Sequence, residues 1–358
     1  MSNEIAQSLT QLLDLTRRTP GTIFPFDLNQ GRMVIFSDLH KGARNGADDF
    51  RAAERAYHAA LSYYLYKGYT LVVLGDAEEL WEETPQAVIN AYGHTLKLEA
   101  QFHQQGRYLR VWGNHDDMWQ FPDAVQTHLH PFYPGLQVRE GLILQMKEQE
   151  QTKGELFMVH GHQGTLESDR FSQLSRWAVR HLWRPIQRWF NISLNTPAED
   201  ARLRTQHDQA LYRWAEQQVG LILVAGHTHR PVFKAKAHMA QIEDQIKAHE
   251  ALLAAAAPEE RPAIIERLAE FHAEMEWVKT QERQKPQESG LDQTVPCYFN
   301  SGCCCFSDGD ITGLELADGY FRLVRWPDKD DKPRRHILES ARIVDVLAEA
   351  QAKRLAAS

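Results

Sequence analysis

Five short apolar runs in this chain each end in a cluster of side chains that can bind metal ions. In chain order the clusters are Asp38-Leu39-His40, Gly75-Asp76, Gly113-Asn114-His115-Asp116, His160-Gly161-His162 and Gly226-His227-Thr228-His229. Each run has the length and apolar content of a buried strand. Ligands that follow strands lie at one edge of a sheet, where loops converge on a common site. The sequence therefore predicts a metal site at the edge of a sheet.

Strand-like and helix-like segments alternate in the first part of the chain. Strands are expected at 33–36, 71–74 and 108–112, and helices at 5–16, 49–67 and 86–105. This alternation predicts an α/β core, and apolar residues on both faces of the strands indicate strands buried between layers. Further strands are expected at 156–159 and 221–225, and a hairpin at 311–326 around Asp318-Gly319.

The composition fits a globular protein with one large core or two modest ones. The chain has 358 residues, is 43% hydrophobic and carries a formal net charge of -8. This acidic balance argues against general nucleic-acid binding, which usually needs a basic surface. The first residues resemble no signal peptide, and no apolar run approaches the ~20 residues that cross a bilayer. We therefore expect a cytoplasmic protein.

The four cysteines lie close together near the end of the chain. They are Cys297, Cys303, Cys304 and Cys305. Three consecutive cysteines cannot form an ordinary disulfide framework, so we expect reduced thiols in the core and a reducing compartment. The alternative is an extra metal or redox site, although no partner cysteine stands at zinc-finger spacing.

Two stretches do not fit a minimal core. The first, at about 166–218, looks mostly helical, with arginines at every fourth position and tryptophans between them: Arg176, Arg180, Arg184, Arg188, Trp177, Trp183 and Trp189. This helix either caps a lipid-phosphate or rests on a membrane surface as a peripheral contact, or it packs on the core with its arginines in water. Pro185 starts or kinks a helix there.

The second stretch, at about 237–286, has apolar residues spaced alternately by three and four, which predicts an antiparallel helical hairpin. Three interpretations of this hairpin are open: an insertion packed on itself, a homodimer contact or a lid over the site. The expected organisation is a helical segment at 1–30, a core at 31–235 that includes the cap, the hairpin at 236–288, core-completing strands at 289–345 and a tail at 346–358.

The clusters supply nitrogen and oxygen ligands for two divalent cations. The candidate ligands are Asp38, His40, Asp76, Asn114, His160, His227 and His229. Asp76 suits a bridging position because its two carboxylate oxygens can each hold one cation. This mixed donor set favours manganese, with iron, zinc, cobalt or nickel as alternatives, over calcium or magnesium.

The motif series resembles that of the calcineurin-like metallophosphoesterase superfamily over residues 31–232, with a further element at Asn300-Ser301-Gly302. The resemblance implies an α/β fold of the αββα type, a two-sheet sandwich with helical insertions. It also implies one metal held by Asp38, His40, Asp76 and His229, and a second held by Asp76, Asn114, His160 and His227.

Two cations about 3.5–4 Å apart activate a bridging water to hydroxide at neutral pH and neutralise phosphoryl oxygens. His115 follows a ligand directly, and we expect it to act as general acid on the leaving oxygen. The resemblance implies that Glu79 orients this imidazole; the alternative is a solvated carboxylate at a helix start. Lys41, Arg44 and Asn45 follow the first motif and either contact the substrate phosphate or are ordinary loop residues.

The segment from Gly75 to Trp81 resembles the G-D-x-x-E-x-W motif of UDP-2,3-diacylglucosamine pyrophosphohydrolases, from which the chain departs at His115, at His162 and in the 237–286 insertion. It lacks the D-R-G of calcineurin-type protein phosphatases. We therefore expect a hydrolase of small-molecule or lipid-linked phosphoesters or pyrophosphates, first of the nucleotide-sugar-lipid type. The alternatives are a nuclease or cyclic-nucleotide phosphodiesterase, and a catalytically silent scaffold.

Overall fold

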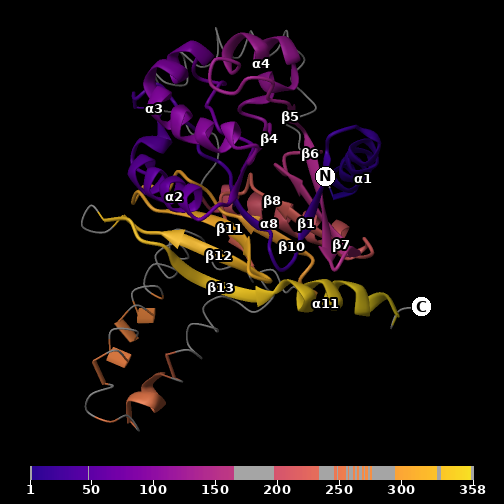
Figure 1. Cartoon of the computed structure of the whole chain (residues 1–358), viewed down its shortest axis with the longest axis vertical. Coiled ribbons are helices and arrows are strands. Elements are labelled where there is room, and N and C mark those ends of the chain that lie inside the picture. Colours follow the sequence, from indigo (N-terminus) through magenta and orange to yellow (C-terminus); the bar gives the residue numbers. More distant parts are fainter. Residues whose placement is uncertain are drawn as a thin grey trace.

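Two β-sheets pack face to face, with helices on their outer faces. The computed structural model describes residues 2–46, 48–164, 197–233, 295–328 and 332–355, with short pieces between 246 and 275. In Figure 1, α2 (Glu54–Tyr66), α3 (Pro85–Gln104) and α4 (Pro122–His128) lie on one side of the sheets, and α1 (Ser2–Arg18) lies on another. The predicted αββα sandwich is confirmed.

The first sheet holds the strands that carry the first three motifs. Its order is β13-β12-β11-β2-β3-β4-β5. The bounds are β2 Arg32–Phe36, β3 Thr70–Leu74, β4 Tyr108–Val111, β5 Val138–Arg139, β11 Ile311–Ala317, β12 Tyr320–Trp326 and β13 His336–Arg342. Strands β2, β3 and β4 are parallel neighbours, so their carboxyl ends lie at the same edge. The hairpin predicted around Asp318 is formed by β11 and β12.

The second sheet holds the strands that carry the last two motifs. Its order is β1-β6-β7-β8-β10-β9. The bounds are β1 Ile23–Asp27, β6 Gly141–Glu148, β7 Gln151–Val159, β8 Leu221–Ala225, β9 Pro231–Val232 and β10 Tyr298–Ser301. Strands β7, β8 and β10 are parallel neighbours. The ends of β7 and β8 therefore also share one edge.

Alternation of side chains along each strand explains why both faces of both sheets are apolar. In β2, Met33 and Ile35 pack in the core between the sheets, whereas Val34 and Phe36 pack under the outer helices. Successive side chains point to opposite faces of a sheet, so a strand covered on both sides needs a continuous apolar run. The same pattern in β8 packs Leu221 and Leu223 against α1 and α8 (Pro197–Glu216).

Strand β6 was not predicted, and of β7 only the end, at 156–159, was expected. β6 and β7 form a hairpin whose turn residues, Gln149 and Glu150, both have positive φ angles, of 47° and 65°. Such turns usually carry Asn-Gly or Asp-Gly, so the sequence gives no turn signal here. The segment at 1–30, expected to be helical, also contributes β1, which pairs with β6. Beyond β13, the tail expected at 346–358 belongs to the helix α11 (Ile343–Leu355), which buries Val346 and Leu347 in the core between the sheets.

The two insertions are described only in part. The arginine and tryptophan segment lies outside the described residues, which resume at α8. Within the hairpin segment, Ile246 and Leu268 are buried and Leu253, Phe271 and Met275 pack against them. This packing agrees with an insertion folded on itself, whereas the homodimer, lid and membrane contacts stay predictions. Among the described residues, no helix is both long enough and apolar enough to cross a membrane.

A buried carboxylate ties α3 to the first sheet. Glu99 is fully buried and accepts hydrogen bonds from the hydroxyls of Tyr57, Tyr108 and Tyr133 at 3.2, 3.0 and 2.9 Å. It also accepts one from the ammonium of Lys41 at 3.1 Å. A buried charge is tolerated when it is paired and hydrogen-bonded in this way. Removing this carboxylate takes one hydrogen-bond acceptor from the buried ammonium of Lys41 and one from each of the three tyrosine hydroxyls.

We predict that Glu99→Ala lowers the free energy of unfolding by about 3–5 kcal/mol, because it removes one partner of a buried ion pair. Urea denaturation followed by circular dichroism measures the change. Lys97→Ala, an exposed change on the same helix, is the control and should shift stability by less than about 0.5 kcal/mol. Equal stability of the two variants would contradict a structural role for this network.

Candidate metal centre

All seven candidate ligands lie just beyond the carboxyl ends of strands. Asp38 and His40 follow β2, Asp76 follows β3, Asn114 follows β4, His160 follows β7, and His227 and His229 follow β8. Three of the five motifs thus come from one sheet and two from the other. Side chains that are far apart in the sequence are brought together at the edge where both sheets end.

The turns that follow the strands are strained. Asp38, His40, Asp76, His227 and His229 have φ angles of 52°, 49°, 49°, 69° and 57°, in the left-handed region. Each such conformation costs roughly 1–3 kcal/mol for a residue with a side chain, and such residues gather at functional sites. The turns are held by backbone bonds, such as the His40 N–H to the Asp76 carbonyl at 2.9 Å.

Two glycines of the motifs allow the loops to approach closely. A Cβ atom added at Gly113 would collide with Oδ1 of Asp76. One added at Gly226 would lie 2.5 Å from Oδ2 of Asp38. The glycines are therefore required so that backbone can pass directly beside the two carboxylates.

Asp76 lies at the centre of the cluster and is almost fully buried. Its Oδ2 is 3.0 Å from Nε2 of His160 and 3.8 Å from Nε2 of His40. Its Oδ1 accepts the backbone N–H of His115 at 2.8 Å. Burial alone would raise the pKa of Asp76, but His160 and His115 hold it well below the usual range. The carboxylate is therefore ionised and faces histidines from both sheets.

The orientation of the histidine rings leaves nitrogen lone pairs facing other acceptors. Nδ1 of His160 is 3.0 Å from the carbonyl oxygen of Leu74, so that nitrogen carries the hydrogen and Nε2 faces Asp76. Nε2 of His40 lies 3.1 Å from Nε2 of His229. Facing acceptors repel one another unless a proton or a cation lies between them. These contacts fit a cation site.

Two buried atoms of the candidate ligands lack the hydrogen bonds that buried polar atoms normally make. They are Oδ1 of Asn114 and Nε2 of His160, which have no hydrogen-bond partner in the part of the chain that the structure describes. Both are atoms of the kind that bind transition metals. The donor set therefore fits two divalent cations.

The electrostatics of the cluster also favour cations. Burial lowers the pKa of His160, but Asp76 and Asp38 outweigh burial and raise it to about 9. Asp38 acts in the same way on His229, whose pKa rises to about 10. Burial and His160 instead hold the pKa of His227 well below its usual value. Cations and protons would compete for the nitrogens beside the carboxylates, so metal binding should release protons.

Three groups of described residues have ligand atoms close enough to hold an ion. They are Asp76 with His160 and His227, His40 with Asp76 and His115, and His40 with His229 and Cys305. The first contains three of the four ligands predicted for the second metal. The third group adds Cys305, which the sequence did not single out as a neighbour of the ligands. All four cysteines are free thiols.

His115 and Glu79 meet beside the cluster. Nδ1 of His115 is 2.7 Å from Oε2 of Glu79, and the same oxygen is 3.1 Å from Nδ1 of His40. Burial would raise the pKa of Glu79, but these two histidines lower it to about 2. The ring of Trp81 stacks on the ring of His115, with centroids 4.1 Å apart. The His115 side chain is 25% exposed, so it lies at the open side of the cluster.

The structure does not place Lys41 at the surface of the loop, where a substrate contact was expected. Its side chain is fully buried, with the ammonium 3.2 Å from Glu78 and 3.1 Å from Glu99. A sequence pattern cannot show that this lysine turns inward, away from the loop surface. Arg44 instead pairs with Glu54 at 2.7 Å, and Asn45 donates to Glu83 at 2.6 Å. A substrate role for these last two side chains stays a prediction.

The family is shown by comparison with known proteins. The family model described as calcineurin-like phosphoesterase matches residues 31–231, more than half of the chain. The chain therefore belongs to the calcineurin-like phosphoesterase family, whose members bind divalent metals. The substrate subgroup is not decided by this match.

Similar solved structures are Vacuolar Protein Sorting 29 from Cryptosporidium parvum and a single mutant of Vps29 from Entamoeba histolytica. The first is 11% identical, with a TM-score of 0.34, covering 87% of this chain and 98% of that chain. The second is 14% identical, with a TM-score of 0.30, covering 86% of this chain and 98% of that chain. No curated protein matches the chain.

We predict that Asp76→Asn lowers the bound metal from about two equivalents per chain to below one, because the shared carboxylate loses its charge. Elemental analysis after dialysis against manganese measures the stoichiometry. Asp123→Asn, at an exposed carboxylate of α4, is the matched control and should bind as the unaltered protein does. Retention of two equivalents by Asp76→Asn would show that this carboxylate is not the bridge.

Proposed function

We propose that the protein is a metal-dependent hydrolase of phosphoester or pyrophosphate bonds. The observation that carries this proposal is the convergence of nitrogen and oxygen donors from both sheets around the buried carboxylate of Asp76. Asp38, His40, Asp76 and His229 would hold one divalent cation, and Asp76, Asn114, His160 and His227 the other. When bound, the cations supply water activation and neutralisation of phosphoryl charge.

His115 is the proposed general acid for the leaving oxygen. Its Nδ1 donates to Glu79, so Nε2 is the nitrogen that holds the transferable proton. A carboxylate partner favours the protonated imidazole that an acid requires. Stacking on Trp81 fixes the plane of the ring, and the partial exposure of His115 leaves its edge accessible. Glu79 therefore positions the acid and maintains its charge.

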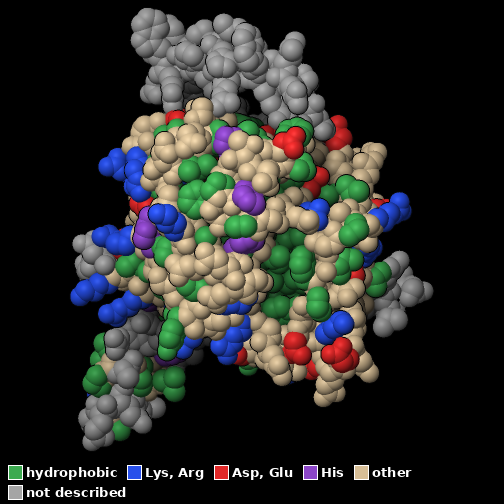
Figure 2. All heavy atoms as spheres, turned by 45° about the horizontal axis from the view of Figure 1, so that its top comes forward, with side chains coloured by type: hydrophobic (Ala, Val, Ile, Leu, Met, Phe, Trp, Pro, Cys, Tyr) green, Lys and Arg blue, Asp and Glu red, His purple; other side chains and the backbone are tan. Residues whose placement is uncertain are grey.

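The proposed substrate class is a nucleotide-sugar-lipid or similar lipid-linked pyrophosphate. Support comes from the Gly75-to-Trp81 segment, because Glu79 and Trp81 both contact the ring of His115. The competing nucleic-acid substrates need a basic groove. On the face drawn in Figure 2, Lys and Arg side chains are scattered around the rim and form no continuous basic groove, and most of the histidines lie nearer the middle. That distribution, with the net charge of -8, favours a small or lipid-linked substrate.

We predict that His115→Ala leaves the metal content intact and lowers turnover roughly 10²–10⁴-fold, the usual contribution of a general acid. A model phosphodiester with a poor leaving group, assayed with manganese-loaded protein, should show the full effect. His130→Ala, at an exposed histidine outside the cluster, is the control. If His115→Ala keeps its metal and its full activity, the assignment of the acid is wrong.

A hydrolysis screen tests the substrate class. We expect manganese-loaded protein to cleave model diesters and, with higher kcat/KM, lipid-linked nucleotide-sugar pyrophosphates, while Asp76→Asn cleaves neither. Single-stranded DNA and cyclic nucleotides belong in the same screen. Preference for those substrates would replace the proposed class with a nuclease or cyclic-nucleotide phosphodiesterase. No turnover of any substrate by fully metal-loaded protein would indicate a silent scaffold.

A further inference from the structure

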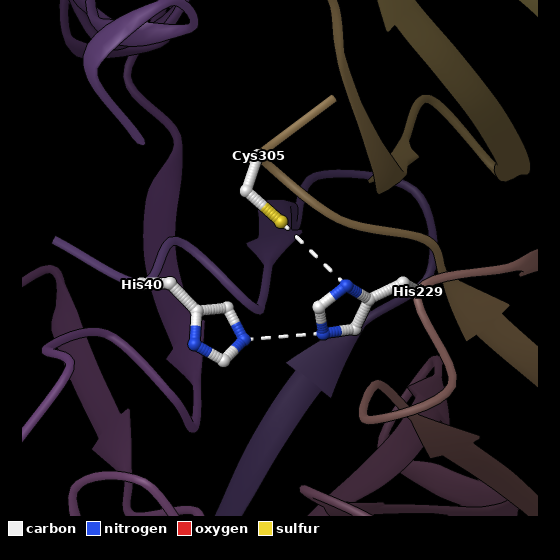
Figure 3. Close-up of side chains that lie close together, drawn as sticks. All are labelled: His40, His229 and Cys305. Carbon is white, nitrogen blue, oxygen red and sulfur yellow. Dashed lines mark hydrogen bonds between the residues drawn. The ribbon is translucent and has the colours of Figure 1, made fainter. Parts of the chain in front are cut away.

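Cys305 lies beside the ring of His229, near His40. Its Sγ is 3.6 Å from Nδ1 of His229, and Figure 3 shows the thiol pointing at that nitrogen, while the ring of His40 lies beside the other ring nitrogen. The other ring nitrogen, Nε2, faces Nε2 of His40 at 3.1 Å and Oδ1 of Asp38 at 3.2 Å. One nitrogen of the ring therefore faces the metal cluster, and the other faces sulfur.

The backbone holds this cysteine segment against the first motif. It follows β10, and the N–H of Cys304 donates to the carbonyl of Asp38 at 3.1 Å. The carbonyl of Cys303 accepts the N–H of Thr312, from β11, at 3.1 Å. Gly302 makes the turn between β10 and the cysteines with a φ of 76°, where a Cβ would collide with Thr312. The position of Cys305 is thus fixed by both sheets.

A histidine that binds a metal through one nitrogen is usually fixed by a hydrogen bond from the other. That bond sets the tautomer: a hydrogen on Nδ1 leaves the lone pair of Nε2 for the metal. The acceptor in such pairs is commonly a carboxylate, a carbonyl or water. At His229 the atom beside Nδ1 is the sulfur of Cys305.

We propose that Cys305 is a positioning residue of the metal centre, whose sulfur accepts a hydrogen bond from Nδ1 of His229 and thereby presents Nε2 to the cation. The inference rests on the proposed metal-dependent function. It differs from direct ligation by sulfur, which the spacing of His40, His229 and Cys305 would also allow. Positioning is favoured because Asp38 and His40 approach Nε2, whereas sulfur approaches Nδ1.

The neighbouring cysteines, Cys303 and Cys304, provide variants with which a change at Cys305 can be compared. The thiol of Cys303 lies against both Cys305 and His229. Cys304 is fully buried, and its Sγ faces the carbonyl of Thr312 at 3.8 Å, among the apolar side chains under the outer helices. Cys304→Ala therefore changes packing beside the site without removing a sulfur from the ring of His229.

The test measures manganese affinity of the full chain by equilibrium dialysis. We expect Cys305→Ala to weaken binding about 10- to 100-fold, the usual effect of removing the hydrogen-bond partner of a ligating histidine. Cys305→Ser keeps an acceptor at the same place and should recover most of the affinity. It also keeps the test valid if Cys305→Ala does not fold. Cys304→Ala should bind as the unaltered protein does.

A spectrum separates positioning from ligation. If Cys305 does not bind the metal, cobalt-loaded protein has no charge-transfer band from its sulfur to cobalt. A sulfur-to-cobalt band that is lost in Cys305→Ser would show direct ligation and overturn the proposal. It is also overturned if Cys305→Ala binds manganese as tightly as the unaltered protein, or if only Cys303→Ala weakens binding. If the unaltered protein binds no metal, the proposed function fails, which is distinct from failure of the cysteine inference alone.

Discussion

One buried carboxylate, that of Asp76, is the point at which the two sheets of this protein meet. Asp76 follows β3 of one sheet, and its Oδ2 lies 3.0 Å from His160, which follows β7 of the other. Each sheet alone provides an incomplete set of ligands. The sandwich must therefore form before the donor set exists, so the metal centre depends on the whole fold rather than on a local motif.

Buried charged residues next to the site stabilise the strained turns at the strand ends. Arg110 pairs with Glu78 and lies 3.5 Å from Asp116, and all three side chains are buried. Asp116 also accepts the backbone N–H of Gly113 at 2.6 Å and of Ala77 at 2.9 Å. Glu78 and Asp116 each follow a candidate ligand, Asp76 or Asn114, by two residues. Both carboxylates lie beside the same arginine, Arg110. These bonds offset the cost of left-handed backbone at the site.

The sequence was informative where buried strands run straight into polar motifs. Both faces of β2, β3 and β8 are covered, so their apolar runs are continuous and easily recognised. The β6–β7 hairpin was missed because its turn at Gln149 and Glu150 lacks the usual residues. Strand β1 was missed because it is short, partly exposed and contains Pro25.

At the site, residue type and order predicted the cluster, but not the direction of individual side chains. Lys41 and His40 are adjacent, yet Lys41 enters a buried acidic cluster while His40 faces Asp76. The contact between Cys305 and His229 joins residues far apart in the chain, and no local spacing signals it. Such contacts follow from how the loops of two sheets pack, which a pattern of residue types does not contain.

The most direct test of the account is an anomalous-scattering map from crystals soaked in manganese. The account predicts two peaks about 3.5–4 Å apart, on either side of the Asp76 carboxylate, with Nε2 of His160 and of His229 among the nearest atoms. A map without peaks at the ends of β2, β3, β7 and β8, or with a cation bound elsewhere, would contradict it.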